Sequence, residues 1–239
     1  MLELKNISCG YGKKLIIKNI SLTLEKGEFV SIIGVNGCGK TTLLKAITGI
    51  LKKAEGNIQI DGQPVKSQKE IARKIAYLPQ NKSTPEMSVG ELVLHGRYPH
   101  LSSHTYNDKD KEISLWAMRE AGVEALKDIP LSRLSGGMKQ NAYIAMALCQ
   151  QSDYILLDEP STHLDISHQL SLMKFLSNSD KGVLSVMHDL PLAFKFSSRI
   201  VLMDKGEILI DKTPEKVLSS GIIKEIFGVS LSKDYSYEI

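Results

Sequence analysis

The sequence predicts an α/β fold in which buried strands alternate with helices, after an antiparallel β segment and around an inserted block of helices. Three observations support this fold class. Short continuous apolar runs suit strands covered on both faces, alternating runs near the N-terminus suit half-buried strands, and residues 85–150 show helical periodicity. The chain has 239 residues, 42% hydrophobic and 24% charged, which is the size and composition of one large globular domain.

Composition excludes several classes of protein. No apolar run approaches the length of a membrane-spanning helix, about 18 residues, and the N-terminus shows no signal peptide. The cysteines Cys9, Cys38 and Cys149 form no CxxC pair, so we expect neither a disulfide framework nor a zinc site. A net charge of +3 is too small and dispersed to indicate nucleic-acid binding. These features predict a soluble protein of a reducing compartment.

The N-terminal elements follow from their apolar patterns. Residues 20–25 alternate between apolar and polar side chains, and residues 58–60 do the same before a turn at 61–62. Residues 29–33 form a short run that is apolar apart from Ser31, which predicts a strand buried on both faces. A glycine-rich loop follows this strand directly, and a helical pattern then ends at Gly49.

The middle of the chain is helical. Ser88 and Glu91 have the spacing of a capping box, so a helix is expected to begin there, and a second is expected over residues 108–121. A third helix is expected after Ser135. Its expected buried stripe consists of Met138, Ala142, Ala145, Met146 and Cys149.

Strand patterns return after these helices. The apolar runs are Tyr154–Leu157, Val183–Met187 and Ile200–Met203, and a hairpin turn is expected at residues 204–206. The helices at 85–150 therefore form an insertion into an α/β core, and residues 1–239 are expected to be a single domain.

The glycine-rich loop matches G-x-x-x-x-G-K-[ST] at every fixed position. Its residues are Gly34, Val35, Asn36, Gly37, Cys38, Gly39, Lys40 and Thr41, followed by Thr42. The glycines let backbone N–H groups surround phosphate oxygens, and the helix that begins near Lys40 adds its positive end. Lys40 is expected to contact the β- and γ-phosphates, and the Thr41 hydroxyl to bind Mg²⁺. A dinucleotide fingerprint is the alternative, but its glycine spacing differs and it needs no Lys-Thr pair.

The strand at 154–157 ends in two adjacent carboxylates. Asp158, at its carboxyl end, is placed to reach Mg²⁺, and Glu159 is placed to orient and deprotonate an attacking water. The simpler interpretation is a strand that leaves the core through an acidic loop. The phosphate-binding loop upstream favours the catalytic interpretation.

A second anion-binding helix start occurs at Ser135, Gly136 and Gly137. Ser135 is expected to cap the helix while the glycines leave its first N–H groups accessible. The alternative is an ordinary helix cap. Because one phosphate chain cannot easily use two separate helix starts, the second site suggests a second molecule.

In their order and spacing, these motifs resemble those of the ATP-binding cassette (ABC) ATPases over nearly the whole chain. The resemblance implies a P-loop NTPase core of ABC type with an N-terminal antiparallel β subdomain and a helical subdomain at about 85–150. It implies that Tyr11 stacks on adenine, that Gln80 meets Mg²⁺ and the membrane partner, and that His188 touches the γ-phosphate. Residues 161–165 resemble the D-loop of these proteins.

The same resemblance implies partners and a location. Two cassettes would pair head to tail, so that residues 135–137 of one cap the ATP held by the other. Residues 85–100 are similar to the segment that docks onto the permease in importer ATPases for iron–siderophore complexes, haem and cobalamin. This chain would then be a peripheral motor at the cytoplasmic face of the membrane, with permease subunits and, indirectly, a substrate-binding protein as partners.

The residues are also compatible with two other functions. One is a non-transport cassette such as a cytosolic iron–sulfur assembly ATPase, and the other is an ATP-binding module without catalysis. The presence of both Glu159 and His188 disfavours the second. The sequence departs from the family at Met138, where Gln or Glu is usual, and at Met146, where Arg is usual, which bears on turnover.

Overall fold

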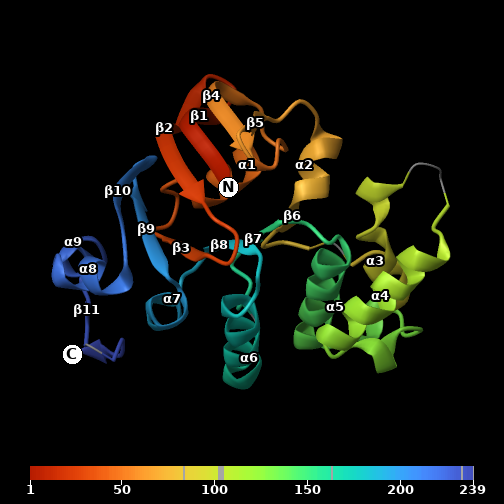
Figure 1. The fold of residues 1–239 in the computed structure, drawn as a ribbon. Helices are drawn as coiled ribbons and strands as arrows, with labels where there is room; N and C mark the ends of the chain where they lie inside the picture. The colour runs from red at the N-terminus through yellow and green to blue at the C-terminus, as the bar shows by residue number, and fades with distance from the viewer. Residues whose placement is uncertain (83, 102–104, 163, 233, 239) are drawn as a thin grey trace.

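The computed structural model describes residues 1–82, 84–101, 105–162, 164–232 and 234–238. An antiparallel sheet forms the N-terminal part, with the strand order β2-β1-β4-β5 (Figure 1). Its strands are β1 (Leu2–Tyr11), β2 (Lys14–Leu24), β4 (Lys53–Ile60) and β5 (Gln63–Pro64). The expected alternation is confirmed, because Ile20, Leu22 and Leu24 are buried.

A mixed sheet forms the centre of the molecule, with the strand order β10-β9-β3-β8-β7-β6. Its strands are β3 (Phe29–Ile33), β6 (Ile75–Leu78), β7 (Tyr154–Asp158), β8 (Gly182–Val186), β9 (Arg199–Asp204) and β10 (Glu207–Lys212). The strands from β9 to β6 run parallel, and β10 pairs antiparallel with β9 through the expected hairpin. All five residues of β3 are buried, as expected for a strand covered on both faces.

Helices cover both faces of the mixed sheet. Helix α1 (Lys40–Ile47) lies between the two sheets, and α2 (Gln68–Lys74), which sequence patterns did not predict, precedes β6 (Figure 1). The remaining helices are α3 (Val89–His95), α4 (Asp108–Glu120), α5 (Gly136–Cys149), α6 (Ile166–Ser177), α7 (Leu190–Phe196), α8 (Pro214–Ser219) and α9 (Ile222–Phe227). The 3₁₀ turns are η1 (Tyr98–His100), η2 (Glu124–Leu126) and η3 (Leu131–Arg133), and β11 (Ser230–Leu231) pairs with β12 (Tyr237–Glu238).

The mixed sheet separates two hydrophobic clusters, because successive strand residues point to opposite faces. Val30 and Ile32 of β3 join α1 and the antiparallel sheet, whereas Phe29 and Ile33 join the cluster of α3–α7. Helices α3, α4 and α5 share this second cluster with β6 and β7. Helix α5 packs against β6, and α3 and α4 pack against α5 and against each other.

The caps expected in the helical region are confirmed. Ser88 and Glu91 form a capping box at the start of α3, and the Ser135 hydroxyl accepts a hydrogen bond from Met138 N at the start of α5. The expected stripe on α5 is wrong at Met138, which is 47% exposed. Met138 lies in the first turn of α5, where the helix projects beyond the core, whereas Ala142, Ala145 and Cys149 are buried.

The sheet topology brings separate loops to one edge. Because β3, β8, β7 and β6 are parallel neighbours, their carboxyl ends lie side by side. The loops that leave these four ends carry residues 34–41, 188, 159 and 80 respectively. In the described residues, no helix is long and apolar enough to cross a membrane.

Candidate functional site

The glycine-rich loop connects β3 to α1 and encloses the amine of Lys40. Lys40 Nζ donates hydrogen bonds to the carbonyls of Gly34, at 2.7 Å, and Val35, at 3.1 Å. Gly34 has a φ of +152°, and a Cβ at this position would lie 2.2 Å from the carbonyl oxygen of Met203. Gly39 is the N-cap of α1 and has a φ of +110°, so the first N–H groups of the helix meet no capping side chain. This loop can therefore bind an anion at a helix start that also carries a cation.

Thr41 and Asp158 meet behind this loop. The Thr41 hydroxyl donates to Asp158 Oδ1 at 3.1 Å, whereas the buried Oδ2 has no hydrogen-bond partner among the described residues. Burial raises the pKa of Asp158, and so does the charge of Glu159, although the hydrogen bond from Thr41 opposes the shift. The nearby Tyr77 hydroxyl is also buried, and its own pKa is raised, first by burial and then by the charge of Asp158. An unpaired carboxylate oxygen beside a hydroxyl fits a divalent cation.

Glu159 lies at the mouth of the same site with both carboxylate oxygens engaged. Oε2 accepts a hydrogen bond from Gln80 Nε2 at 2.6 Å, and Oε1 lies 2.6 Å from His188 Nε2. The backbone of Glu159 has a φ of +52°, which non-glycine residues rarely adopt, and its N–H donates to Val186 O at 3.1 Å. Strands β6, β7 and β8 thus deliver one polar side chain each to a single point.

These residues line one pocket of about 580 Å³. Its lining consists of Ile16, Asn36, Gly37, Gly39, Lys40, Thr41, Thr42, Gln80, Glu159 and His188. Most of the site residues predicted from the sequence are therefore brought together. Gly34 and Cys38 belong to the same loop but are buried behind its surface.

Two groups of predicted residues do not line this pocket. Residues 135–137 lie at the start of α5, and Tyr11, which is 51% exposed, lies at the end of β1. Of the predicted D-loop at 161–165, residue 163 lies outside the described residues, and Asp165 caps α6 by accepting a hydrogen bond from His168 N.

Sequence reasoning missed three residues in or beside the site. Ile16 lines the pocket from β2, and its apolar side chain gave no signal for a polar site. Lys82 and Gln140 hydrogen-bond to each other at 2.6 Å although they lie on different segments. No spacing rule connects them, so only the fold reveals the contact. No group of three or more His, Cys, Asp or Glu side chains among the described residues could hold a metal alone.

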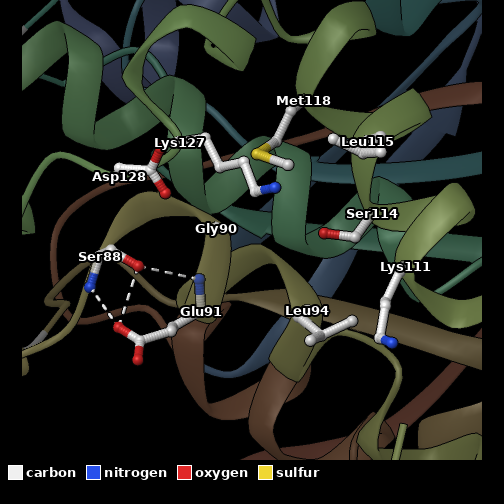
Figure 2. Close-up of a pocket in the computed structure, with 10 residues that line it drawn as sticks. All are labelled: Ser88, Gly90, Glu91, Leu94, Lys111, Ser114, Leu115, Met118, Lys127 and Asp128. Carbon is white, nitrogen blue, oxygen red and sulfur yellow. Dashed lines mark hydrogen bonds between the residues drawn. The ribbon is translucent and has the colours of Figure 1, made fainter. Parts of the chain in front are cut away.

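A second pocket, of about 540 Å³, lies between α3 and α4 (Figure 2). Leu94, Leu115 and Met118 contribute its apolar surface. Its other lining residues are Ser88, Gly90, Glu91, Lys111, Ser114, Lys127 and Asp128. Ser88 and Glu91 are held by their capping box, with Ser88 N donating to Glu91 Oε2 at 2.7 Å. An apolar floor with charges of both signs around it suits an amphipathic protein segment.

A glycine-rich loop between a parallel strand and a helix, with an aspartate on a nearby strand, defines the P-loop class of nucleotide-binding proteins. Residues 17–162 match the ABC transporter family. The chain therefore belongs to the ABC transporter family and is an ATPase subunit of it.

Relatives and solved structures agree with this assignment. The chain is 39% identical over 233 residues to the ferric enterobactin transport ATP-binding protein FepC of Escherichia coli (strain K12), covering 94% of this chain and 86% of FepC. It is 37% identical over 236 residues to the iron(3+)-hydroxamate import ATP-binding protein FhuC of Bacillus subtilis (strain 168), covering 95% of this chain and 88% of FhuC. A dimeric ATP-binding cassette solved in a post-hydrolysis state with ADP and Pi has a TM-score of 0.77, with 27% identity over 90% of this chain and 99% of that one.

Proposed function

We propose that this chain is the ATP-hydrolysing motor subunit of an ABC importer for iron chelates of the ferric siderophore type, with haem or cobalamin as the alternative solutes. The observation that carries the proposal is the convergence of Gln80, Glu159 and His188 at the mouth of the phosphate-binding loop. The two relatives described above, a ferric enterobactin transport protein and an iron(3+)-hydroxamate import protein, support the solute class, and this chain covers 86% and 88% of their lengths. Residues 1–239 act as one ATPase domain in which residues 85–150 form the helical subdomain.

The glycine-rich loop binds the phosphates of ATP. Backbone N–H groups of residues 36–42 contact phosphate oxygens, and Lys40 exchanges its carbonyl partners for the β- and γ-phosphates. The unpaired Asp158 Oδ2, the Thr41 hydroxyl and the Gln80 amide fit Mg²⁺. When bound, the cation neutralises charge that develops on the phosphates. Tyr11 stacks on the adenine ring from outside the pocket.

Glu159 orients the attacking water and takes its proton. Its carboxylate is held between Gln80 and His188, so its direction is fixed before the substrate binds. His188, which lines the same pocket, then contacts the γ-phosphate. Positioning and charge neutralisation are the main requirements of phosphoryl transfer, and these residues meet both.

The complete site needs a second copy of the chain. Ser135, Gly136 and Gly137 present a helix start outside the pocket, so they are available to the ATP of a partner cassette in a head-to-tail homodimer. The dimeric cassette with a similar fold supports this arrangement. ATP favours the closed dimer, and hydrolysis releases it.

The permease contacts the helical subdomain at the cytoplasmic face of the membrane. The pocket between α3 and α4 offers Leu94 and Leu115, above the buried Met118, to an amphipathic helix of the permease. Its lysines and acids face the polar side of that helix (Figure 2). Residues 85–100 contribute part of this pocket, in agreement with their similarity to the docking segment of importer ATPases. A substrate-binding protein would deliver the solute to the permease.

Glu159→Gln tests the motor and the transport assignment together. Glutamine retains the size of the side chain but cannot accept the proton, so we expect ATPase activity to fall about 10²- to 10⁴-fold while ATP binding persists. ATP should then trap a dimer, measured by size-exclusion chromatography. Cells that depend on this gene should lose uptake of ferric siderophores.

Glu207→Gln, at an exposed position on β10, is the matched control. It should retain wild-type ATPase activity, ATP binding and siderophore uptake, and ATP should not trap it as a dimer. Wild-type turnover in Glu159→Gln would overturn the role of the general base. Unchanged siderophore uptake, with uptake of haem or cobalamin lost instead, would overturn the solute class.

A further inference from the structure

The contact between Lys82 and Gln140 joins the loop after β6 to the helix that begins at Ser135. Lys82 Nζ donates a hydrogen bond to Gln140 Oε1 at 2.6 Å and lies 5.8 Å from the centre of the Tyr143 ring. Gln140 and Tyr143 both belong to α5, and Gln140 is only 6% exposed. The lysine is therefore held by two adjacent turns of one helix.

Gln140 uses its other end for a second contact. Its Nε2 donates to the carbonyl of Pro160 at 2.6 Å, and Pro160 directly follows Glu159 in the chain. Both ends of one buried amide are thus engaged, one by the loop that carries Gln80 and one by the loop that carries Glu159. A buried amide that loses a partner is costly to leave unpaired, so this geometry is well fixed.

These contacts close a ring around the catalytic carboxylate. Glu159 is joined along the chain to Pro160, whose carbonyl accepts a hydrogen bond from Gln140. Gln140 accepts a hydrogen bond from Lys82, which lies two residues after Gln80 in the chain. The Gln80 amide then donates to Glu159 Oε2, which completes the ring. A displacement of α5 that keeps these hydrogen bonds moves Gln80, Glu159 or both. Because α5 begins at residues 135–137, the ring connects the part of the chain offered to the partner's ATP with the chain's own catalytic loop.

We propose that Lys82 and Gln140 are positioning residues for ATP hydrolysis, which couple the placement of α5 to the alignment of Gln80 and Glu159. Neither touches the substrate. The inference rests on the proposed ATPase function, and neither Lys82 nor Gln140 belongs to the sequence motifs described above. A small misplacement of a catalytic group costs much of the rate, so loss of the ring should lower kcat while the phosphate-binding loop remains intact.

Lys82→Met removes the amine and retains the length of the chain. We expect kcat for ATP hydrolysis to fall about tenfold, with KM for ATP and the Kd for ATP within twofold of wild type. Gln140→Met should have an effect of the same size or greater. Because Lys82 acts through Gln140, the double variant should be no worse than Gln140→Met, as measured in a double-mutant cycle.

Gln140→Glu separates the two hydrogen bonds, because a carboxylate still accepts from Lys82 but cannot donate to Pro160 O. We expect its kcat to fall with the Lys82 contact intact. Lys109→Met, at an exposed position on α4, is the control and should retain wild-type kcat. Thermal unfolding of every variant distinguishes positioning from a loss of folded protein.

A wild-type kcat in Lys82→Met, additive effects in the cycle, or a fall in kcat that only parallels the loss of folded protein would overturn the inference. Absence of ATPase activity in the wild-type chain would instead overturn the proposed function. The two failures are therefore distinguishable.

Discussion

At the scale of single residues, Cys38 places a thiol inside the glycine-rich loop. Its side chain is 3% exposed inside the phosphate-binding loop, and Lys40 Nζ lies 4.0 Å from its sulfur. Burial raises the pKa of the Cys38 thiol, and the positive charge of Lys40 only partly offsets the shift. The reactive thiolate is therefore scarce at neutral pH.

We expect N-ethylmaleimide to modify Cys38 slowly at pH 7 and faster as the pH rises toward the raised pKa, because the thiolate fraction grows in that direction. ATP should protect the residue, and the adduct should prevent nucleotide binding because it occupies the loop. Peptide mass spectrometry measures the modification and fluorescence titration measures ATP binding. Cys38→Ala retains the buried Cys9 and Cys149, and its ATP binding should resist the reagent. Full ATP binding by a chain alkylated at Cys38 would contradict this account.

At the scale of elements, one buried arginine ties together three parts of the helical region. Arg97 Nε donates to Asp110 Oδ1 on α4 at 2.9 Å, and Arg97 Nη1 donates to the Cys149 carbonyl at the end of α5 at 3.1 Å. Both ionised side chains are less than a tenth exposed. Burial alone would raise the pKa of Asp110, but the hydrogen bonds from Arg97 and from the backbone of Asn107, with the charge of Arg97, lower it overall.

Arg97→Met should lower the free energy of unfolding by about 3–5 kcal/mol at pH 7, because it leaves a buried carboxylate unpaired. The lowered pKa of Asp110 stabilises the fold above the unfolded pKa of about 3.9, and this contribution is lost as the pH falls through the folded pKa. The difference in the free energy of unfolding between wild type and Arg97→Met should therefore become smaller at acidic pH, as measured by urea denaturation. Arg119→Met breaks the exposed pair with Glu124 and should cost only about 0–1 kcal/mol. Equal losses in the two variants would refute the assignment.

Among the elements, features that depend on neighbouring residues could be predicted from the sequence, whereas contacts between distant strands could not. The capping box at Ser88, the cap at Ser135 and the buried strand β3 depend on neighbouring residues, so local patterns predicted them correctly. The hydrogen bonds of Glu159 join loops that follow three different strands, and they depend on the strand order, which no local pattern encodes. Helices α2, α6, α7, α8 and α9 were not predicted. In α2 all residues are at least partly exposed, so it carries no apolar stripe.

At the scale of the whole molecule, the separation of residues 135–137 from the pocket predicts that two chains build each site. We expect chains with Lys40→Ala and chains with Ser135→Arg to be inactive alone. Random pairing of the two should restore about a quarter of wild-type ATPase activity, because half of the dimers then hold one intact site of two. A coupled ATPase assay on the mixture measures this recovery.

A chain that carries both substitutions is the control, because it supplies neither an intact loop nor an intact α5 start and should rescue neither parent. No recovery in the mixture of single variants would contradict the composite site. Recovery would also show that the two chains contribute different residues to one site.

The order of strands has a consequence for how the protein is made. Strand β3 carries the phosphate-binding loop, yet its two neighbours come from far along the chain, with Phe29 paired to Val183 and Val30 paired to Arg199. Such non-local pairings form late in folding, because the intervening chain must be present first. During synthesis the loop is therefore complete long before its strand has either neighbour. The capacity to bind nucleotide thus arises only after both neighbours of β3 have been made, and a chain truncated before residue 183 retains the whole motif but lacks the sheet that holds it.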